Sequence, residues 1–132
     1  MLKNYRYTIL FLSWLVFITS LSLFSMSKFG GVSGWLRIPH KDKIVHFSFY
    51  FISTILGSFA LREFSQKKIS LNNAAVKMFL FSVVYGMIIE VLQYSITKDR
   101  HGDFYDFIAN SIGAFSGLLL VKYFFSQRVS QK

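Results

Sequence analysis

Apolar residues fill four long blocks of the chain, and the charged residues gather between them. Residues 7–27 and 107–121 contain no charge, 44–61 contain only His46 as a group that titrates near neutral pH, and 78–97 contain only Glu90 as a charge. A stretch of about 20 apolar residues spans a bilayer. The pattern therefore predicts an all-α, four-helix transmembrane bundle with short loops. It forms one membrane domain over residues 1–132, with helices at about 7–27, 43–62, 76–97 and 103–125.

Composition narrows the class of protein further. Only 16% of the 132 residues are charged and 53% are hydrophobic, whereas about 25% charged residues is usual for a soluble domain. The net charge of +9 comes from Lys and Arg in loops and tails, where a basic excess is ordinary for a membrane protein. The sequence has no basic helix face of the kind that would indicate nucleic-acid binding. The chain has no cysteine, which excludes disulfides, thiolate metal sites and cysteine nucleophiles.

The basic residues also predict an orientation. The apolar run after Lys3 and Arg6 is long for a signal peptide, so we expect a retained first helix. With the N-terminus inside, nine basic residues lie in the N-tail, the second loop and the C-tail, against six on the other side. The positive-inside rule then places both termini in the cytoplasm and the first and third loops outside.

Three of the predicted helices carry matching stripes. Helices packed in a membrane repeat their contact face every three or four residues, and small residues let their backbones approach. Each stripe has polar residues at its outer end and small residues further into the membrane. The stripes are Lys43, His46, Tyr50, Ser53 and Gly57; Ser82 or Val83, Gly86, Glu90, Gln93 and Thr97; and Asp103, Asp106, Asn110, Gly113 and Gly117. The first helix offers only Ser13, Thr19 and Ser20, and is expected to pack as a wall.

In a hairpin-connected bundle the polar ends of the three stripes lie on one side of the membrane, so their side chains can converge in a pocket. Ionisable groups at such depth are costly and indicate function. At about 1.5 Å rise per residue, Glu90 and Asn110 lie roughly 10–12 Å below the mouth and form its floor. The candidate catalytic residues are His46, Glu90, Asp103 and Asp106, and the candidate ligand-binding residues are Asp42, Lys43, Gln93, Arg100 and Asn110.

Several of these residues have a structural interpretation as well. Asp103 has the position of an N-cap for the fourth helix. Lys43 and Arg100 suit the membrane interface, where long basic side chains reach toward water. His46 suits a hydrogen bond between helices. Glu90 is the hardest to explain structurally, because it is a lone carboxylate deep in an apolar helix.

The spacing of these residues resembles that of the VanZ-like membrane proteins. The matching set is Asp42-Lys43-x-x-His46, Glu90-x-x-Gln93 and Arg100-x-x-Asp103-x-x-Asp106-x-x-x-Asn110-x-x-Gly113-x-x-x-Gly117. Members often carry Pro-Gly before the arginine, whereas this chain has Lys98-Asp99. The resemblance implies a multi-pass protein of the bacterial cytoplasmic membrane and cell envelope. The family takes its name from a member linked to resistance to teicoplanin, a glycopeptide, and the resemblance implies no settled biochemical activity.

The favoured hypothesis is an outward-facing pocket that binds or modifies a lipid-linked envelope precursor or a lipid headgroup, and so contributes to glycopeptide resistance. Lys43 and Arg100 would hold an anionic group, and His46 or Glu90 would serve as acid or base. The alternative is a non-enzymatic accessory protein whose polar stripe docks a partner helix or lipid. A proton pathway is a third hypothesis.

The sequence leaves several points open: whether a reaction is catalysed, which cofactor, if any, is used, and whether the partner is a second copy of the chain or another membrane protein. A metal held by the four candidate catalytic residues has suitable ligands, but no short metal-binding motif accompanies them, so no metal site is predicted.

Overall fold

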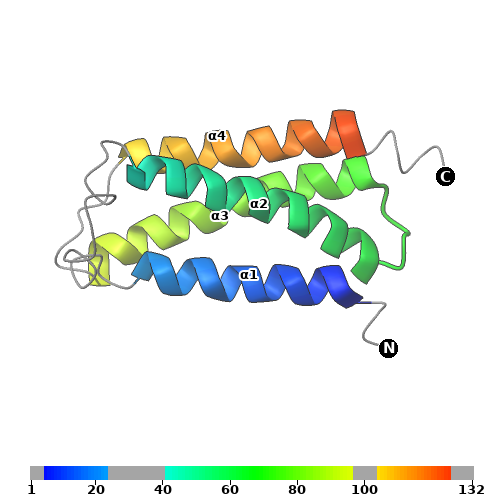
Figure 1. Cartoon of the computed structure of the whole chain (residues 1–132), viewed down its shortest axis with the longest axis horizontal. Helices are drawn as coiled ribbons and strands as arrows, with labels where there is room; N and C mark the ends of the chain where they lie inside the picture. Colours follow the sequence, from blue (N-terminus) through cyan, green and yellow to red (C-terminus); the bar gives the residue numbers. More distant parts are fainter. Residues whose placement is uncertain (1–4, 24–40, 97–103, 126–132) are drawn as a thin grey trace.

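The computed structural model describes residues 5–23, 41–96 and 104–125, and these form four helices (Figure 1). They are α1 (Arg6–Leu23), α2 (Lys41–Phe64), α3 (Leu71–Ile96) and α4 (Phe104–Leu120), which continues into a π-helical turn, η4 (Val121–Phe125). All four are long and apolar enough to cross a membrane. The predicted all-α, four-helix transmembrane bundle is confirmed.

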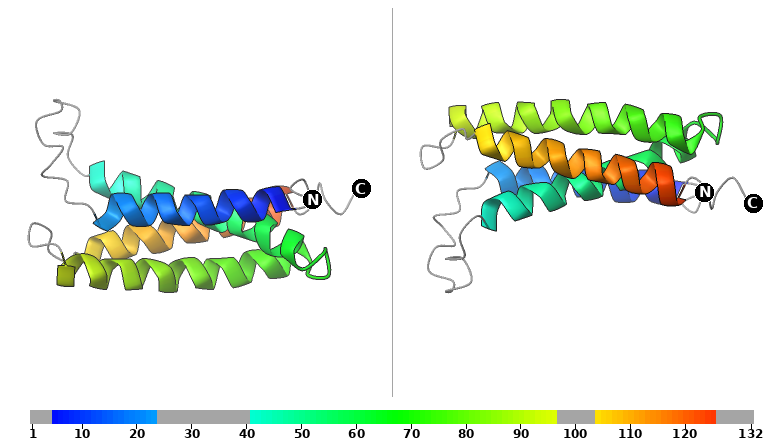
Figure 2. Two further views of the ribbon diagram at one scale, coloured as in Figure 1. Left: turned by 90° about the horizontal axis from the view of Figure 1, so that it is seen from below. Right: turned by 90° about the horizontal axis from the view of Figure 1, so that it is seen from above.

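The helices lie along one long axis, with α2 and α3 between α1 and α4 (Figures 1 and 2). The most extensive contact joins α2 to α4. Two glycines of α4 make this contact close. A Cβ atom at Gly113 would collide with the carbonyl oxygen of Phe47, and one at Gly117 would lie 2.7 Å from that of Phe51. Without side chains at these two positions, the two backbones can touch.

Helix α1 packs against α2 and α3, and its contact face differs from the predicted one. Phe11 and Ile18 are buried, whereas Ser13 and Ser20 are exposed. Of the three hydroxyl residues expected on that face, only Thr19 reaches a neighbour, the hydroxyl of Tyr85. The prediction for Ser13 and Ser20 was wrong because a serine in a helix can satisfy its hydroxyl on its own backbone, so it does not mark a contact face.

Helix α2 ends in a Schellman motif. The amide of Lys67 donates to the carbonyl of Arg62 over 2.9 Å, and that of Gln66 donates to the carbonyl of Glu63 over 3.0 Å. Gln66 and Lys67 have φ of 58° and 66°, in the left-handed region that glycine normally occupies at such an end. The chain therefore reverses between α2 and α3 at some cost in backbone strain.

Helix α3 begins at Leu71, five residues before the predicted start at 76. Ser70 caps it: the hydroxyl accepts a hydrogen bond from the amide of Asn73 over 3.2 Å, as an N-cap serine does. The predicted boundary had left residues 71–75 in the loop. In fact this turn is helical, and Leu71 and Ala75 pack against Val121 of η4.

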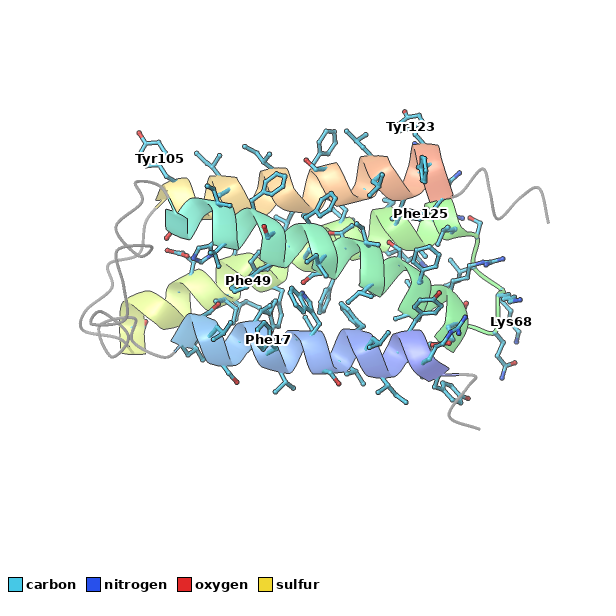
Figure 3. All side chains as sticks on the ribbon, viewed as in Figure 1. Phe17, Phe49, Lys68, Tyr105, Tyr123 and Phe125 are labelled. Atoms are coloured by element: carbon cyan, nitrogen blue, oxygen red, sulfur yellow. The ribbon has the colours of Figure 1, made fainter. Side chains whose placement is uncertain are left out.

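The outer surface of the bundle is apolar, as a lipid-facing surface must be. Val16 and Val91, for example, are 68% and 63% exposed. Tyr105 and Tyr123 project outward from the two ends of the fourth helix (Figure 3). They are separated by about 27 Å at 1.5 Å per residue, close to the roughly 30 Å of a bilayer core. This spacing is typical of aromatic residues at the two membrane interfaces.

Candidate functional site

The polar site lies where α2 and α4 begin and α3 approaches its end. Because neighbouring helices are antiparallel, this is the end of the bundle opposite to the one where α1 begins and η4 ends (Figures 1 and 2). His46 is in the second turn of α2, and Asp106 is in the first turn of α4. Side chains from all three helices therefore meet near one membrane face.

The centre of the site is a hydrogen bond between α2 and α4. The His46 Nδ1 atom lies 3.0 Å from the Asn110 Oδ1 atom, and the two side chains are 3% and 1% exposed. An amide oxygen can only accept, so in this orientation Nδ1 carries the proton and donates it. The other ring nitrogen, Nε2, is then directed away from Asn110.

Asp106 faces that second ring nitrogen. Its Oδ2 atom lies 3.9 Å from His46 Nε2, within the range of an ion pair when the imidazole carries both protons. Asp106 is also buried, with 8% of its surface exposed. As an acidic residue in the first turn of α4, it is also favoured by the helix dipole. One histidine thus bridges an amide and a carboxylate one helical turn apart on α4.

Helix α3 approaches this pair through a glycine. A Cβ atom at Gly86 would lie 3.1 Å from Asn110 Nδ2 and 3.4 Å from Tyr50 Cε1. Tyr50 is completely buried, and Glu90 and Tyr85 of α3 lie within electrostatic range of its hydroxyl. The Glu90 carboxylate is half-buried, with one oxygen closed off from solvent. Glu90 is therefore on the α3 side of the site, one helical turn beyond Gly86.

The structure brings together three of the nine predicted site residues, His46, Asp106 and Asn110, and Glu90 lies on α3 one helical turn beyond Gly86. Arg100 and Asp103 lie outside the described residues. Asp42, Lys43 and Gln93 lie on the described helices α2 and α3, but their side chains are outside the described part. Within the described ranges, no three His, Asp or Glu side chains are close enough to hold a metal ion.

Deeper in the bundle, two buried hydroxyls of α2 bond to the protein itself. Thr54 donates to the hydroxyl of Ser82 over 3.1 Å and lies 3.0 Å from the carbonyl oxygen of Tyr50. Ser58 donates to the Thr54 carbonyl over 2.6 Å. The first contact joins α2 to α3 and the second lies within α2, so these hydroxyls are already paired.

Two polar contacts of α1 escaped the sequence reasoning. The Trp14 indole donates to Ser53 Oγ over 3.0 Å, and the Glu63 carboxylate accepts from the Thr8 amide over 2.8 Å. Both had a signal. An indole N–H inside a membrane needs an acceptor, and an acidic residue near a helix C-terminus opposes its own helix dipole and gains from a partner elsewhere.

Comparison with known protein families gives a match over most of the chain. Residues 5–126 match the model of the family described as VanZ/LLP1, over all four helices. No curated protein matches the chain, and no solved structure matches it.

Proposed function

Since this chain belongs to the VanZ/LLP1 family, we propose that its polar site binds or modifies a lipid headgroup or a lipid-linked envelope precursor. We place the protein in the bacterial cytoplasmic membrane, with the site at the outer face. The observation that carries the proposal is the buried contact of His46 with Asn110 and Asp106 across α2 and α4.

A purely structural contact would not need this set of residues. One hydrogen bond between neutral side chains is enough to join two membrane helices, as Thr54 and Ser82 illustrate. Here a histidine and two carboxylates, Asp106 and Glu90, are held near one membrane face instead. Ionisable groups in such a place are costly, and that cost is usual at sites of binding or catalysis.

The geometry assigns roles within the proposal. Asn110 holds the imidazole of His46 through Nδ1, so Nε2 is the nitrogen that can exchange a proton with a ligand or with Asp106. Lys43 and Arg100 are proposed to hold the anionic part of the ligand, because basic side chains bind phosphate groups. A reaction requires that a scissile bond of the ligand lie next to the Nε2 atom of His46.

The outward orientation rests on the distribution of charge. The end of the bundle with the α2–α3 connection carries the larger share of basic residues, nine against six, which favours the cytoplasmic side. The site lies at the other end. An envelope precursor or the outer lipid leaflet is therefore within its reach.

In the docking alternative, the small residues of α4 would be the most suitable surface for a partner helix, but α2 of the same chain already covers them. Gly113 and Gly117, the small residues that would let a partner helix approach, contact α2 of the same chain. A bulky substitution at either position would disturb this bundle before it could disturb a partner.

The proposal is tested by glycopeptide susceptibility of a bacterial host that expresses the chain, with membrane levels of each variant measured by blot. His46→Gln, Glu90→Gln and Asp103→Asn are compared with the parent. The matched control is Glu63→Gln, a carboxylate-to-amide change at the opposite end of α2. We expect a shift for the parent and the control and its loss in the three site variants. Equal shifts in all five would overturn a functional role for the site, and the absence of any shift would remove the resistance part of the proposal.

A further inference from the structure

We propose that Tyr50 and Asn110 donate hydrogen bonds to an ester carbonyl oxygen of a glycerophospholipid bound at this site. The inference rests on the proposed function and narrows its ligand class. The lipid's headgroup would meet His46 and Asp106, and its ester oxygen would meet the two donors one turn deeper.

Both donors are buried and have no acceptor. The Tyr50 hydroxyl and the Asn110 Nδ2 atom are closed off from solvent, and neither makes a hydrogen bond within the described part of the chain. The two side chains are 0% and 1% exposed. A buried donor left unpaired is costly, and such groups are rare enough in native structures to need an explanation.

The contrast with neighbouring polar groups makes the two donors specific. Tyr85, also a phenol on a helix of this core, is paired with Thr19, and Thr54 is paired with Ser82. The other atom of the same amide, Asn110 Oδ1, is paired with His46. Tyr50 and Asn110 are thus the unpaired donors that face Gly86, where α2 and α4 meet α3.

Gly86 makes this place common to both donors. A methyl group there would lie 3.1 Å from Asn110 Nδ2 and 3.4 Å from the Tyr50 ring, so both side chains pack against the same bare stretch of the α3 backbone. A single oxygen atom with two lone pairs can accept from both. An ammonium group could not bind here, because it has only hydrogen-bond donors and the two side chains need an acceptor.

Depth selects the kind of oxygen. The apolar spans begin at Ile44 and Tyr105, so Tyr50 and Asn110 lie about 8–9 Å inside, whereas His46 and Asp106 lie within about 3 Å of the same boundary. On each helix the two levels are four residues apart, about 6 Å. A glycerophospholipid has this arrangement, with its headgroup outermost and ester carbonyls one glycerol unit deeper. A polyprenyl phosphate joins its phosphate directly to hydrocarbon and has no such carbonyl.

In the structure the two donors are enclosed, so lipid entry requires α3 to move away from the α2–α4 pair at this end. The two unpaired donors favour that movement, because the enclosed state leaves them without an acceptor and the lipid-bound state supplies one. A change that removes a donor should therefore stabilise the enclosed protein and weaken lipid binding at the same time. A structural role for the same group predicts a loss of stability instead.

The experiment is a titration of the purified full-length chain in detergent with two short-chain phosphatidylethanolamines that differ only in ester or ether linkage. Two further ligands are an ester lipid and an ether lipid with a glycerol headgroup, and the last is a polyprenyl phosphate. Native mass spectrometry gives the Kd, and thermal unfolding gives the Tm. The variants are Tyr50→Phe, which removes only the hydroxyl, and Asn110→Asp, which keeps Oδ1 for His46 and removes the donor. Tyr85→Phe, the loss of a paired phenol, is the control.

We expect the parent to bind the ester form about tenfold more tightly than the ether form. Tyr50→Phe and Asn110→Asp should reduce this ratio to below about twofold. Tyr50→Phe should keep or raise the Tm, whereas Tyr85→Phe should lower the Tm and keep the ratio.

Three results would overturn the inference. Equal binding of ester and ether lipids, or tighter binding of the polyprenyl phosphate, would remove the ester contact and leave the proposed function standing. A lower Tm in Tyr50→Phe with an unchanged ratio would make Tyr50 structural. Failure of every lipid to bind would remove the proposed function, and the inference with it.

Discussion

The imidazole of His46 and the amide of Asn110 are hydrogen-bond partners 3.0 Å apart across the most extensive helix contact of the bundle. Each is almost fully enclosed, so neither can exchange its partner for water. The pair therefore links the stability of the α2–α4 contact to the geometry of the site.

The first prediction concerns this pair. His46→Ala and Asn110→Ala should each lower the free energy of unfolding by about 1–3 kcal/mol, because each leaves a buried polar group without its partner. The double variant should cost clearly less than the sum, since its second change removes a group already unpaired. Unfolding of the four proteins in mixed micelles measures the coupling. Additive losses would mean that the two side chains do not interact.

The second prediction compares two glycines. Gly113→Ala should lower the free energy of unfolding by at least about 1–3 kcal/mol, because the new methyl group meets the backbone carbonyl of Phe47, which cannot move alone. At Gly57 the nearest atom is the Met78 sulfur, at 2.8 Å. That flexible side chain can move, and alanine is the better helix former. Gly57→Ala should therefore be nearly neutral in the same assay, and equal losses at both positions would contradict the close α2–α4 approach.

The third prediction concerns the end of α2. Gln66→Gly should raise the free energy of unfolding by about 1 kcal/mol, because glycine adopts a φ of 58° without the clash that a Cβ atom causes. Lys68→Gly is the control, since Lys68 has no positive φ. That change should lower stability slightly through added chain entropy. A gain at Lys68 and none at Gln66 would locate the strain elsewhere.

The fourth prediction concerns α1. The Glu63 carboxylate accepts hydrogen bonds from both the amide and the hydroxyl of Thr8, over 2.8 and 3.1 Å. Glu63→Ala should cost about 0.5–2 kcal/mol, as loss of a helix N-cap does, whereas Glu63→Gln keeps an accepting oxygen and should cost less. Hydrogen exchange of the first turn of α1 measures this directly. Unchanged protection in Glu63→Ala would show that the contact does not hold the helix end.

The three stripes could be predicted because their residues carry a physical requirement visible in sequence. His46, Asn110 and Gly113 recur at helical spacing, and a buried ring, a buried amide and a missing side chain each require a neighbouring helix. The stripe positions that the structure describes are indeed buried or half-buried. The same reasoning placed the polar end of the bundle correctly in relation to the helix ends.

The face of α1 and the start of α3 could not be predicted in the same way. Ser13 and Ser20 are exposed, because a helical serine needs no neighbour. The polar residues of 71–75, Asn72 and Asn73, are exposed on the first turn of α3, and the hydrogen bond from Asn73 to Ser70 became visible only in three dimensions. The link between Glu63 and Thr8 spans 55 positions, and no local pattern encodes it.

The separation of His46 and Asn110 along the chain has a consequence for biosynthesis. The two residues are 64 positions apart, on the second and the last helix. A ribosome that delivers the helices one after another inserts His46 into the bilayer well before its amide partner exists. The hydrogen bond between His46 and Asn110 can therefore form only after α4 has been inserted, and the site is completed late in the assembly of the bundle.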